Sequence, residues 1–258
     1  MSEKQPAMKQ APLLDIILSA NEMDEGQLKG RLVVVIDILR ASSTMITALS
    51  NGATKIYPVE ETDQAFRLVQ NMERKQVLTL GERNGVMIEG FDYGNSPLSC
   101  TSEVVGGKQL IMTTTNGTRA LEYSKGAKEI LVGGFLNYTA ILGRVEDALK
   151  DQIPVTLFCA GWRGRPAMED TLFAGMVLNA LIERGNPSLE PLSDAGHMAI
   201  CLAQNLDGEA PFGLVKQSDH ARRLAGRVGE DEIEACCFMD AHPVLPLMQD
   251  GTIELSKQ

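Results

Sequence analysis

The sequence predicts an α/β fold of three layers, with a mostly parallel sheet, helices on both of its faces and a helical C-terminal region. Short runs of β-branched residues alternate with longer segments of helical periodicity as far as residue 184, and this alternation is typical of parallel sheets. Residues 32–36 (LVVVI) are apolar throughout. A strand of this kind is buried on both faces, so we expect it near the centre of the sheet.

Each predicted strand is a run of four or five residues rich in Ile, Val, Leu or aromatic side chains and bounded by polar or turn residues. In order, the predicted strands are 14–18, 32–36, 55–58, 77–80, 109–112, 129–132 and 155–159. The polar, glycine-rich residues 81–85 and the stretch 90–97 predict a long loop at the sheet edge.

The predicted helices follow these strands at 42–50, 63–74, 118–124, 138–150 and 168–184. Hydroxyl residues begin the first helix, and Glu169 and Asp170 lie in the first turn of the last, where such side chains stabilise a helix start. Beyond about Gly185, helices are separated by Asp, Gly and Pro, and residues 244–247 and 252–255 predict a final hairpin.

No Pro/Ser-rich linker or low-complexity stretch divides the chain. We therefore expect residues 1–258 to form a single α/β domain. Within it, residues 1–12 are expected to be flexible and residues 185–243 to form a helical extension.

The composition excludes several classes of function. The 34 acidic and 24 basic residues give a net charge of −10, which would repel a nucleic-acid backbone. No apolar stretch approaches the ~20 residues that cross a bilayer, and a secretory signal is missing, so a cytoplasmic protein is expected. Five cysteines without CxxC spacing and three histidines without HxxxH spacing argue against a disulfide framework and a zinc site. Most of the cysteines are expected to be buried thiols. The sequence leaves open whether the protein forms a homo-oligomer.

Polar residues directly after strands are the first candidates for a site, because ligands of open α/β sheets bind beyond the carboxyl ends of strands. The strongest candidate is residues 36–44 (IDILRASST), where Asp37 follows the apolar strand and Arg40 offers a planar cation. The hydroxyls that open the next helix, where free N–H groups favour an anion, belong to Ser42, Ser43 and Thr44. The alternative is an N-cap serine beside an Asp37–Arg40 ion pair.

Residues 113–119 (TTTNGTR) form a second candidate after another apolar strand. Hydroxyls, an Asn-Gly turn and an arginine on the following helix would make a cradle for an oxyanion. The residues concerned are Thr115, Asn116, Gly117, Thr118 and Arg119. The alternative is a plain strand end, turn and capped helix.

Carboxylates and arginines also follow the remaining strand ends. Glu82 is the most reactive group after 77–80, unless it forms a solvated pair with Arg83. Two arginines precede the adjacent Glu169 and Asp170. Of the two, we favour Arg165 as the residue that binds substrate. The helix dipole alone would account for these two acids, and Trp162 either walls the site or packs in the ordinary way.

A last candidate lies in the helical C-terminal region. His220 and Arg223 share one helix face, whereas Arg222 points elsewhere. We leave His220 open as either a structural residue or a general acid.

Together, these strand ends predict a magnesium-dependent phosphate site. Carboxylates without a histidine cluster favour Mg²⁺ over Zn²⁺, and phosphate hydrolysis needs dense positive charge. The predicted metal ligands are Asp37, Glu82 and Asp170, with Glu169 supporting them; Asp37 is either a ligand or the nucleophile. The arginines expected to bind a small anionic phosphorylated substrate are Arg40, Arg119 and Arg165.

The same motifs resemble those of the 2-phosphosulfolactate phosphatase family. The resemblance runs from about residue 33 to residue 246 and rests on IDILRASST (36–44), GERNG (81–85), GFDYGNSP (90–97), TTTNGTR (113–119) and EDT (169–171), followed by Ala174 and Gly175. It implies a magnesium-dependent enzyme, associated with coenzyme M biosynthesis, that hydrolyses 2-phospho-3-sulfolactate to sulfolactate and inorganic phosphate.

The sequence departs from the family pattern at two places. Where the pattern reads Gly-Arg-Phe-Ser, this chain has GRPA (164–167) and lacks a hydroxyl; where it often has Cys, this chain has Phe173. A cysteine nucleophile at that position is excluded. Two alternatives remain, a phosphatase for a different phosphorylated organic acid and a noncatalytic protein that binds a phospho-acid.

Overall fold

The computed structural model describes residues 12–23, 26–186, 192–206 and 210–256. Its strands are β1 (Leu14–Ile17), β2 (Leu32–Ile36), β3 (Lys55–Pro58), β4 (Val77–Arg83), β5 (Val86–Met87), β6 (Gln109–Thr113), β7 (Glu129–Gly133), β8 (Val155–Cys159), β9 (Pro246–Gln249) and β10 (Thr252–Leu255). Its α-helices are α1 (Ala41–Ser50), α2 (Thr62–Gln70), α3 (Ser102–Val105), α4 (Gly117–Tyr123), α5 (Tyr138–Lys150), α6 (Met168–Glu183), α7 (Asp194–Ala203), α8 (Pro211–Val215), α9 (Asp219–Val228) and α10 (Glu230–Ala235). Every strand and helix predicted from the sequence is present within a few residues of its expected bounds. The flexibility expected of residues 1–12 falls outside the described residues, apart from Pro12.

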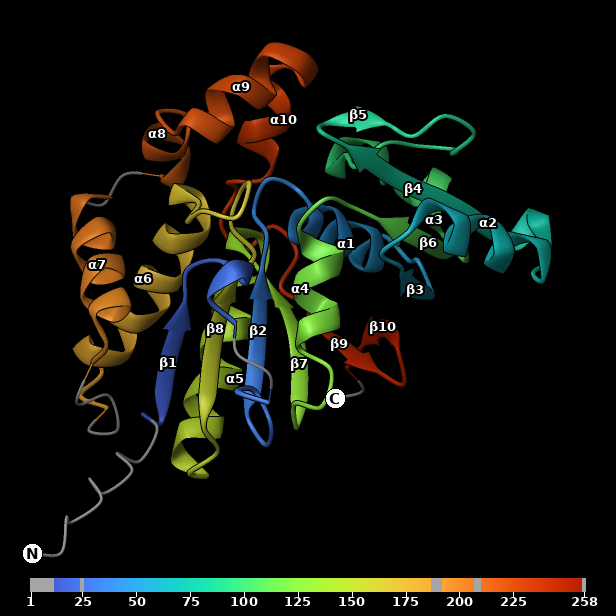
Figure 1. The fold of residues 1–258 in the computed structure, drawn as a ribbon. Coiled ribbons are helices and arrows are strands. Elements are labelled where there is room, and N and C mark those ends of the chain that lie inside the picture. Colours follow the sequence, from blue (N-terminus) through green and yellow to red (C-terminus); the bar gives the residue numbers. More distant parts are fainter. Residues whose placement is uncertain (1–11, 24–25, 187–191, 207–209, 257–258) are drawn as a thin grey trace, which may run out of the picture.

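The strands form a ten-stranded sheet in the order β1-β8-β2-β7-β9-β10-β3-β6-β4-β5 (Figure 1). The pairs β1–β8, β8–β2, β2–β7, β3–β6 and β6–β4 are parallel. β2 lies inside the first parallel group and all of its residues are buried, as its apolar sequence predicts. The mostly parallel α/β class is therefore confirmed.

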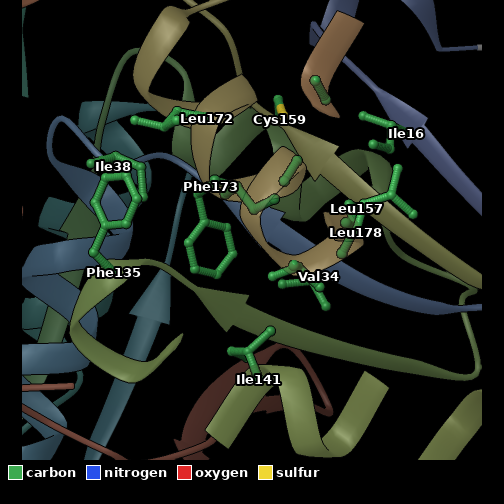
Figure 2. Packing of buried hydrophobic residues seen from close by; sticks show 14 of the residues in the cluster. Ile16, Val34, Ile38, Phe135, Ile141, Leu157, Cys159, Leu172, Phe173 and Leu178 are labelled. Atoms are coloured by element: carbon green, nitrogen blue, oxygen red, sulfur yellow. The ribbon is translucent and has the colours of Figure 1, made fainter. Parts of the chain in front are cut away.

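Helices cover both faces of the sheet. On one face α5 and α6 pack against Val34 and Ile36 of β2, and on the other α1 and α4 pack against Val33 and Val35. Neighbouring strand residues enter different cores because side chains alternate along a strand. In Figure 1, α1 and α4 lie in front of the upright strands and α5 lies behind them. Figure 2 shows the first of these cores, with Val34 and Leu157 of the sheet near Phe173 and Leu178 of α6.

The prediction of a loop at residues 81–85 is wrong. β4 continues to Arg83 and pairs with β5 in an antiparallel hairpin. Asn84 (φ 56°) and Gly85 (φ 82°) form its turn, and an Asn-Gly pair with positive φ at both positions is typical of a two-residue hairpin. Gly81 is required by close packing, since a Cβ there would lie 2.8 Å from the ring of Phe91. Residues 90–96 are irregular, apart from one bridge between Tyr93 and Leu80.

The predicted C-terminal hairpin is present, but its place in the sheet is not one that the sequence predicts. β9 and β10 lie between β7 and β3 and are antiparallel to both of these neighbours. The group β3-β6-β4 therefore runs opposite to the group β1-β8-β2-β7. In a flat sheet, the carboxyl ends of these two groups of strands would lie at opposite edges. Here the sheet bends at the hairpin, and the carboxyl ends of both groups meet at one pocket. Figure 1 shows β3, β4 and β6 lying crosswise to the upright strands.

The C-terminal region is helical, as expected. α7 packs closely on α6 at Gly175, where an added Cβ would collide with the backbone of Ala199. α9 and α10 lie above the arrow tips of β8 and β2 in Figure 1. Residues 187–191 and 207–209 of the predicted extension lie outside the described residues. Within the described part of the chain, every helix is too short or too polar to cross a membrane.

Candidate active site

A pocket lies at the carboxyl ends of β2, β4, β6 and β8, and one face of α9 closes it. The cavity has a volume of about 70 Å³. This is room for on the order of five water molecules, and so for a phosphate group. The pocket is lined by Asp37, Leu39, Arg40, Glu82, Asn84, Gly85, Asn95, Thr114, Thr115, Asn116, Trp162, Arg163, His220, Arg223, Leu224 and Arg227.

Asp37 directly follows β2 and is 7% exposed. Its Oδ1 accepts a hydrogen bond of 3.3 Å from the N–H of Ala41, which begins α1, and its own N–H donates to Ser42 Oγ at 2.9 Å. The Oδ2 atom has no donor among the described residues and faces Gly117, where an added Cβ would approach it to 2.9 Å. The start of α1 thus holds the carboxylate in place and leaves one oxygen for a ligand.

Two acids at the pocket and behind it are buried and lie close to other carboxylates. Burial raises the pKa of Asp37 to about 6; the positive charge of His220 opposes this shift, and the charges of Glu82 and Glu169 add to it. Burial also raises the pKa of Asp170 well above its ordinary value, with Glu169 and Asp37 adding to the shift. Clustered carboxylates of this kind favour the binding of a proton or a cation.

Glu82 reaches the pocket from β4. Its Oε1 accepts hydrogen bonds from the N–H and the hydroxyl of Thr115, both at 2.8 Å, and its Oε2 accepts one from the N–H of Gly85 at 2.6 Å. Arg83 donates instead to backbone carbonyls and to Thr113. The alternative of a solvated Glu82–Arg83 pair is therefore wrong, and Glu82 is a fixed part of the pocket wall.

The adjacent acids of α6 lie behind the pocket and have different partners. Asp170 accepts hydrogen bonds from the N–H of Ile38 at 2.9 Å and of Gly161 at 3.1 Å, so it joins the loops that follow β2 and β8. Glu169 has one oxygen 2.6 Å from Nδ1 of His220, while its buried Oε2 has no partner in the part of the chain that the structure describes. These contacts go beyond the helix dipole, which alone would account for an acidic first turn.

Arg40 lies at the N-terminus of α1 and is 5% exposed. Its Nη1 donates to Glu232 of α10 at 3.0 Å, and Glu232 also accepts a hydrogen bond from the hydroxyl of Ser96. The alternative Asp37–Arg40 ion pair is therefore wrong. The peptide bond between Leu39 and Arg40 is cis. Because a guanidinium has five N–H donors, Arg40 keeps donors for a ligand in the pocket.

Further arginines form a positive cluster at the pocket wall. The guanidinium of Arg163 lies 4.9 Å from the centre of the Trp162 ring and that of Arg223 lies 5.6 Å from it. Arg227 donates to the carbonyl of Asn84. Across the part of the chain that the structure describes, none of these arginines has a carboxylate partner. Desolvation, with the charges of Arg163 and Arg227, lowers the pKa of Arg223, so this wall favours an anion.

Comparison with known proteins agrees with an anion site. Residues 17–251 match the family model of 2-phosphosulpholactate phosphatase, a span that extends beyond the resemblance seen at residues 33–246. The chain belongs to the 2-phosphosulfolactate phosphatase family. The family places it among the enzymes, as a phosphoric monoester hydrolase.

Curated relatives cover nearly the whole chain. A probable 2-phosphosulfolactate phosphatase of Clostridium acetobutylicum is 37% identical over 240 residues, which are 93% of this chain and 99% of the relative. The corresponding protein of Clostridium novyi is 36% identical over 233 residues, 90% of this chain and 95% of the relative. The corresponding protein of Thermotoga maritima is 36% identical over 227 residues, which are 88% of this chain and 93% of the relative.

In this member of the 2-phosphosulfolactate phosphatase family, the pocket unites only part of the predicted site. The predicted residues that line it are Asp37, Arg40, Glu82, Thr115 and Asn116. Glu169 and Asp170 lie behind it, and Gly117 borders Asp37. His220 and Trp162, for which structural roles stayed open, both line the pocket.

The remaining predicted residues do not line the pocket. Ser42, Ser43 and Thr118 donate to the carbonyls of Val35, Ile38 and Thr114, so their hydroxyls stabilise the turns. Thr44 is buried within α1. Arg119 is exposed and donates to the hydroxyl of Tyr123, and Arg165 is exposed outside the pocket.

Sequence reasoning missed Asn84, Asn95, Arg163 and Arg227. A signal for Arg227 was present, because positions 220, 223, 224 and 227 repeat at the spacing of one helix face. Arg163 and Arg165 both lie in a turn with no periodicity, so the pattern could not tell them apart. Asn95 lies in an irregular segment and has no comparable signal.

Cysteine chemistry has no place in this site. Phe173, where the family often has Cys, is a core residue whose ring lies 5.7 Å from that of Phe135 (Figure 2). All five cysteines are free, and four of them are buried, as expected. Burial raises the pKa values of Cys100 and Cys236 to about 12, so these thiols are not reactive.

Proposed function

We propose that this chain hydrolyses 2-phospho-3-sulfolactate to sulfolactate and inorganic phosphate, with the help of Mg²⁺. The observation that carries the proposal is a pocket in which Asp37 faces arginines of three separate segments, Arg40, Arg163 and Arg223. Arginines bind phosphate oxygens, and they stabilise the negative charge that develops as the ester breaks. The names of the family and of the relatives support this substrate.

The oxygen donors at the pocket fit Mg²⁺. In the described residues, no three His, Cys, Asp or Glu side chains converge closely enough to hold a metal ion by themselves. Mg²⁺ suits such a site, because it is commonly held by one or two carboxylates while waters and phosphate oxygens complete its shell. Among the described residues, Oδ2 of Asp37 and the buried Oδ1 of Asn95 have no hydrogen-bond partner.

We therefore assign Asp37 and Glu82 to the ion. Asp170 is outside the pocket lining and accepts N–H groups of Ile38 and Gly161, so we assign it to positioning the loop of Asp37 rather than to metal binding. When bound, Mg²⁺ would neutralise phosphate charge and so assist the break of the ester bond.

The other acid groups of the substrate have partners in the same pocket. 2-Phospho-3-sulfolactate carries a carboxylate and a sulfonate besides its phosphate, and Arg163, Arg223 and Arg227 offer charge for both. The hydroxyl that this chain lacks would lie at Ala167, which is buried and outside the pocket lining. The proposed anion contacts therefore do not include this position.

Phosphate release from a panel of phosphorylated acids tests the proposal. We expect the fastest turnover on 2-phospho-3-sulfolactate, its loss in EDTA and its return with Mg²⁺. Asp37→Asn should lower kcat/KM by at least about 100-fold, which is about 2.7 kcal/mol in barrier height. The exposed Asp151→Asn at the end of α5 is the matched control and should leave the rate unchanged.

If kcat/KM of Asp37→Asn falls by less than tenfold, Asp37 has no catalytic role. Fastest turnover on another acid would indicate a different phosphatase. Binding without turnover of any ester, with Mg²⁺ present, would indicate a phospho-acid binding protein. For an active enzyme, mass spectrometry after a rapid acid quench distinguishes the two roles of Asp37, since phosphate on its peptide identifies it as the nucleophile.

We also place this activity in the cytoplasm and in coenzyme M biosynthesis. The cellular assignment is supported by five free cysteines, which suit a reducing compartment. The pathway follows from the family resemblance of the sequence.

A further inference from the structure

The proposed function assigns no role to one pair of side chains at the pocket, the buried Glu169 and His220 beside it. The geometry points to His220 as the general acid that protonates the leaving group, with Glu169 as the residue that positions it. This inference rests on the proposed phosphatase function and adds the source of the proton to it.

An alkyl phosphate needs such an acid. The ester oxygen would otherwise leave as a strongly basic alkoxide, and a positioned acid typically contributes about 10²–10⁴-fold to the rate. In the step, the P–O bond breaks, its electron pair stays on the ester oxygen, and this oxygen takes the proton from Nε2 of His220. Phosphorus forms its new bond to the attacking oxygen. The proton that the consumed water releases restores His220 through solvent, so ester and water give alcohol and phosphate.

The Glu169 contact decides which nitrogen of His220 is available. Nδ1 lies 2.6 Å from Glu169 Oε1, and Glu169 is 1% exposed. This hydrogen bond fixes the orientation of the ring. Nε2 has no hydrogen-bond partner in the described part of the chain, and the side chain lines the same cavity as Asp37. Nε2 is therefore the nitrogen that serves the substrate.

The surroundings of the ring support a proton donor. Trp162 stacks on it, with ring centres 4.9 Å apart and an angle of 15° between the planes. Among the described residues, the buried carboxylate of Glu169 has no basic side chain other than His220 in contact with it, and an unpaired buried charge is costly. The contact with Nδ1 of His220 therefore stabilises this buried side chain.

No other group at the pocket is as well suited to this task. Arginine does not release its protons. Glu82 accepts three hydrogen bonds and is assigned to the ion, and Asp37 is assigned to the ion or to the attack on phosphorus. His220 is the remaining titratable side chain of the lining.

A comparison of leaving groups tests the proposal in the full-length enzyme. In His220→Gln we expect kcat on 2-phospho-3-sulfolactate to fall by about 100-fold or more. On p-nitrophenyl phosphate, whose leaving group needs no proton, we expect a loss below tenfold. A fold defect would lower both rates equally. The matched control is His197→Gln on the exposed surface of α7, which should change neither rate.

Two further variants keep the proposal open to refutation even if the aryl ester is a poor substrate. Added imidazole should restore part of the activity of His220→Ala on the natural ester, because it can enter the space beside Trp162 and supply the proton. Glu169→Gln should lower kcat more than it raises KM. If wild-type enzyme is active but His220→Gln loses both esters equally and imidazole restores nothing, the acid role is overturned. If wild-type enzyme hydrolyses no ester, the proposed function fails, and the acid role fails with it.

Discussion

At the scale of single residues, two neighbouring acids of α6 differ in their roles because they face different directions. Consecutive positions on a helix do not share a face. Asp170 therefore points back to the backbone N–H groups of Ile38 and Gly161, whereas Glu169 points to His220. One acid joins two strand ends, and the other holds a side chain of the pocket. A change at Asp170 should therefore affect the loops after β2 and β8, whereas a change at Glu169 should affect the position of His220.

The burial of Asp37 predicts a cost in stability that depends on pH. Its pKa of about 6 in the folded protein lies above the ordinary value of 3.8, so the folded state keeps a proton that the unfolded chain has already lost. The free energy of unfolding should therefore fall as pH rises from about 4 to about 6, by up to about 3 kcal/mol, and stay lower above pH 6.

Asp37→Asn removes this effect, so the stability of the variant relative to wild type should grow by up to about 3 kcal/mol between pH 4 and pH 7. Urea unfolding in EDTA, followed by the fluorescence of Trp162, measures it. The charge of Asp37 also raises the pKa of Asp170, so the measured change includes the effect of the substitution on Asp170. A difference in stability that stays constant with pH would contradict the predicted burial cost.

At the scale of elements, the site depends on the close approach of α4 to α1. Gly117 begins α4, and an added Cβ there would lie 2.5 Å from Cβ of Ala41 and 2.9 Å from Oδ2 of Asp37. Only glycine lets the strand end after β6 reach the carboxylate that follows β2. This contact links the two parallel groups of the sheet at the pocket.

Gly117→Ala should therefore move α4 away from Asp37. Overpacking of this kind costs roughly 1–3 kcal/mol, and we expect a loss of phosphatase activity beyond that of stability. Gly143→Ala within α5 is the matched control, since nothing lies within 4 Å of its added Cβ; it should stabilise the protein by about 0.5–1 kcal/mol. Denaturant unfolding and kcat/KM on both variants measure these effects. Unchanged activity in Gly117→Ala would show that the approach of α4 is not required.

At the scale of the whole molecule, the net charge of −10 and the local charge of the pocket have opposite signs. Arg223 lies in the pocket wall, whereas its neighbour Arg222 is exposed and pairs with Asp219. Replacing either arginine by glutamine changes the net charge by the same amount, from −10 to −11. The two variants therefore separate the effect of position from the effect of total charge.

We expect kcat/KM of wild type and Arg222→Gln to fall as ionic strength rises from about 0.01 to about 1 M, because the Debye length shrinks from ~30 Å to ~3 Å. Arg223→Gln should raise KM by about tenfold, which is about 1.4 kcal/mol, and should lose most of this salt dependence. Steady-state kinetics on the same ester measures both effects. If the two variants behave alike, total charge rather than the arginine cluster governs substrate capture.

Much of the fold and part of the site could be predicted from the sequence. Asp37 and Glu82 could be found because each follows a recognisable apolar strand. Arg119 was chosen for the pocket because it follows a turn of the right kind, but on α4 it points to Tyr123. Arg227 lies far along the chain from every strand end, so only the packing of α9 over the pocket brings it to the site.

The sequence by itself determined the order of the longer strands and helices up to α6, the buried strand β2 and the acids at the strand ends, because periodicity and turn residues act over a few neighbouring positions. Only the tertiary structure decided that β9 and β10 join two opposed parallel groups and that α9 closes the pocket. It also decided that Glu169 meets His220 across the fold. These features depend on contacts between residues far apart in the chain, and local patterns carry no information about which distant surfaces meet.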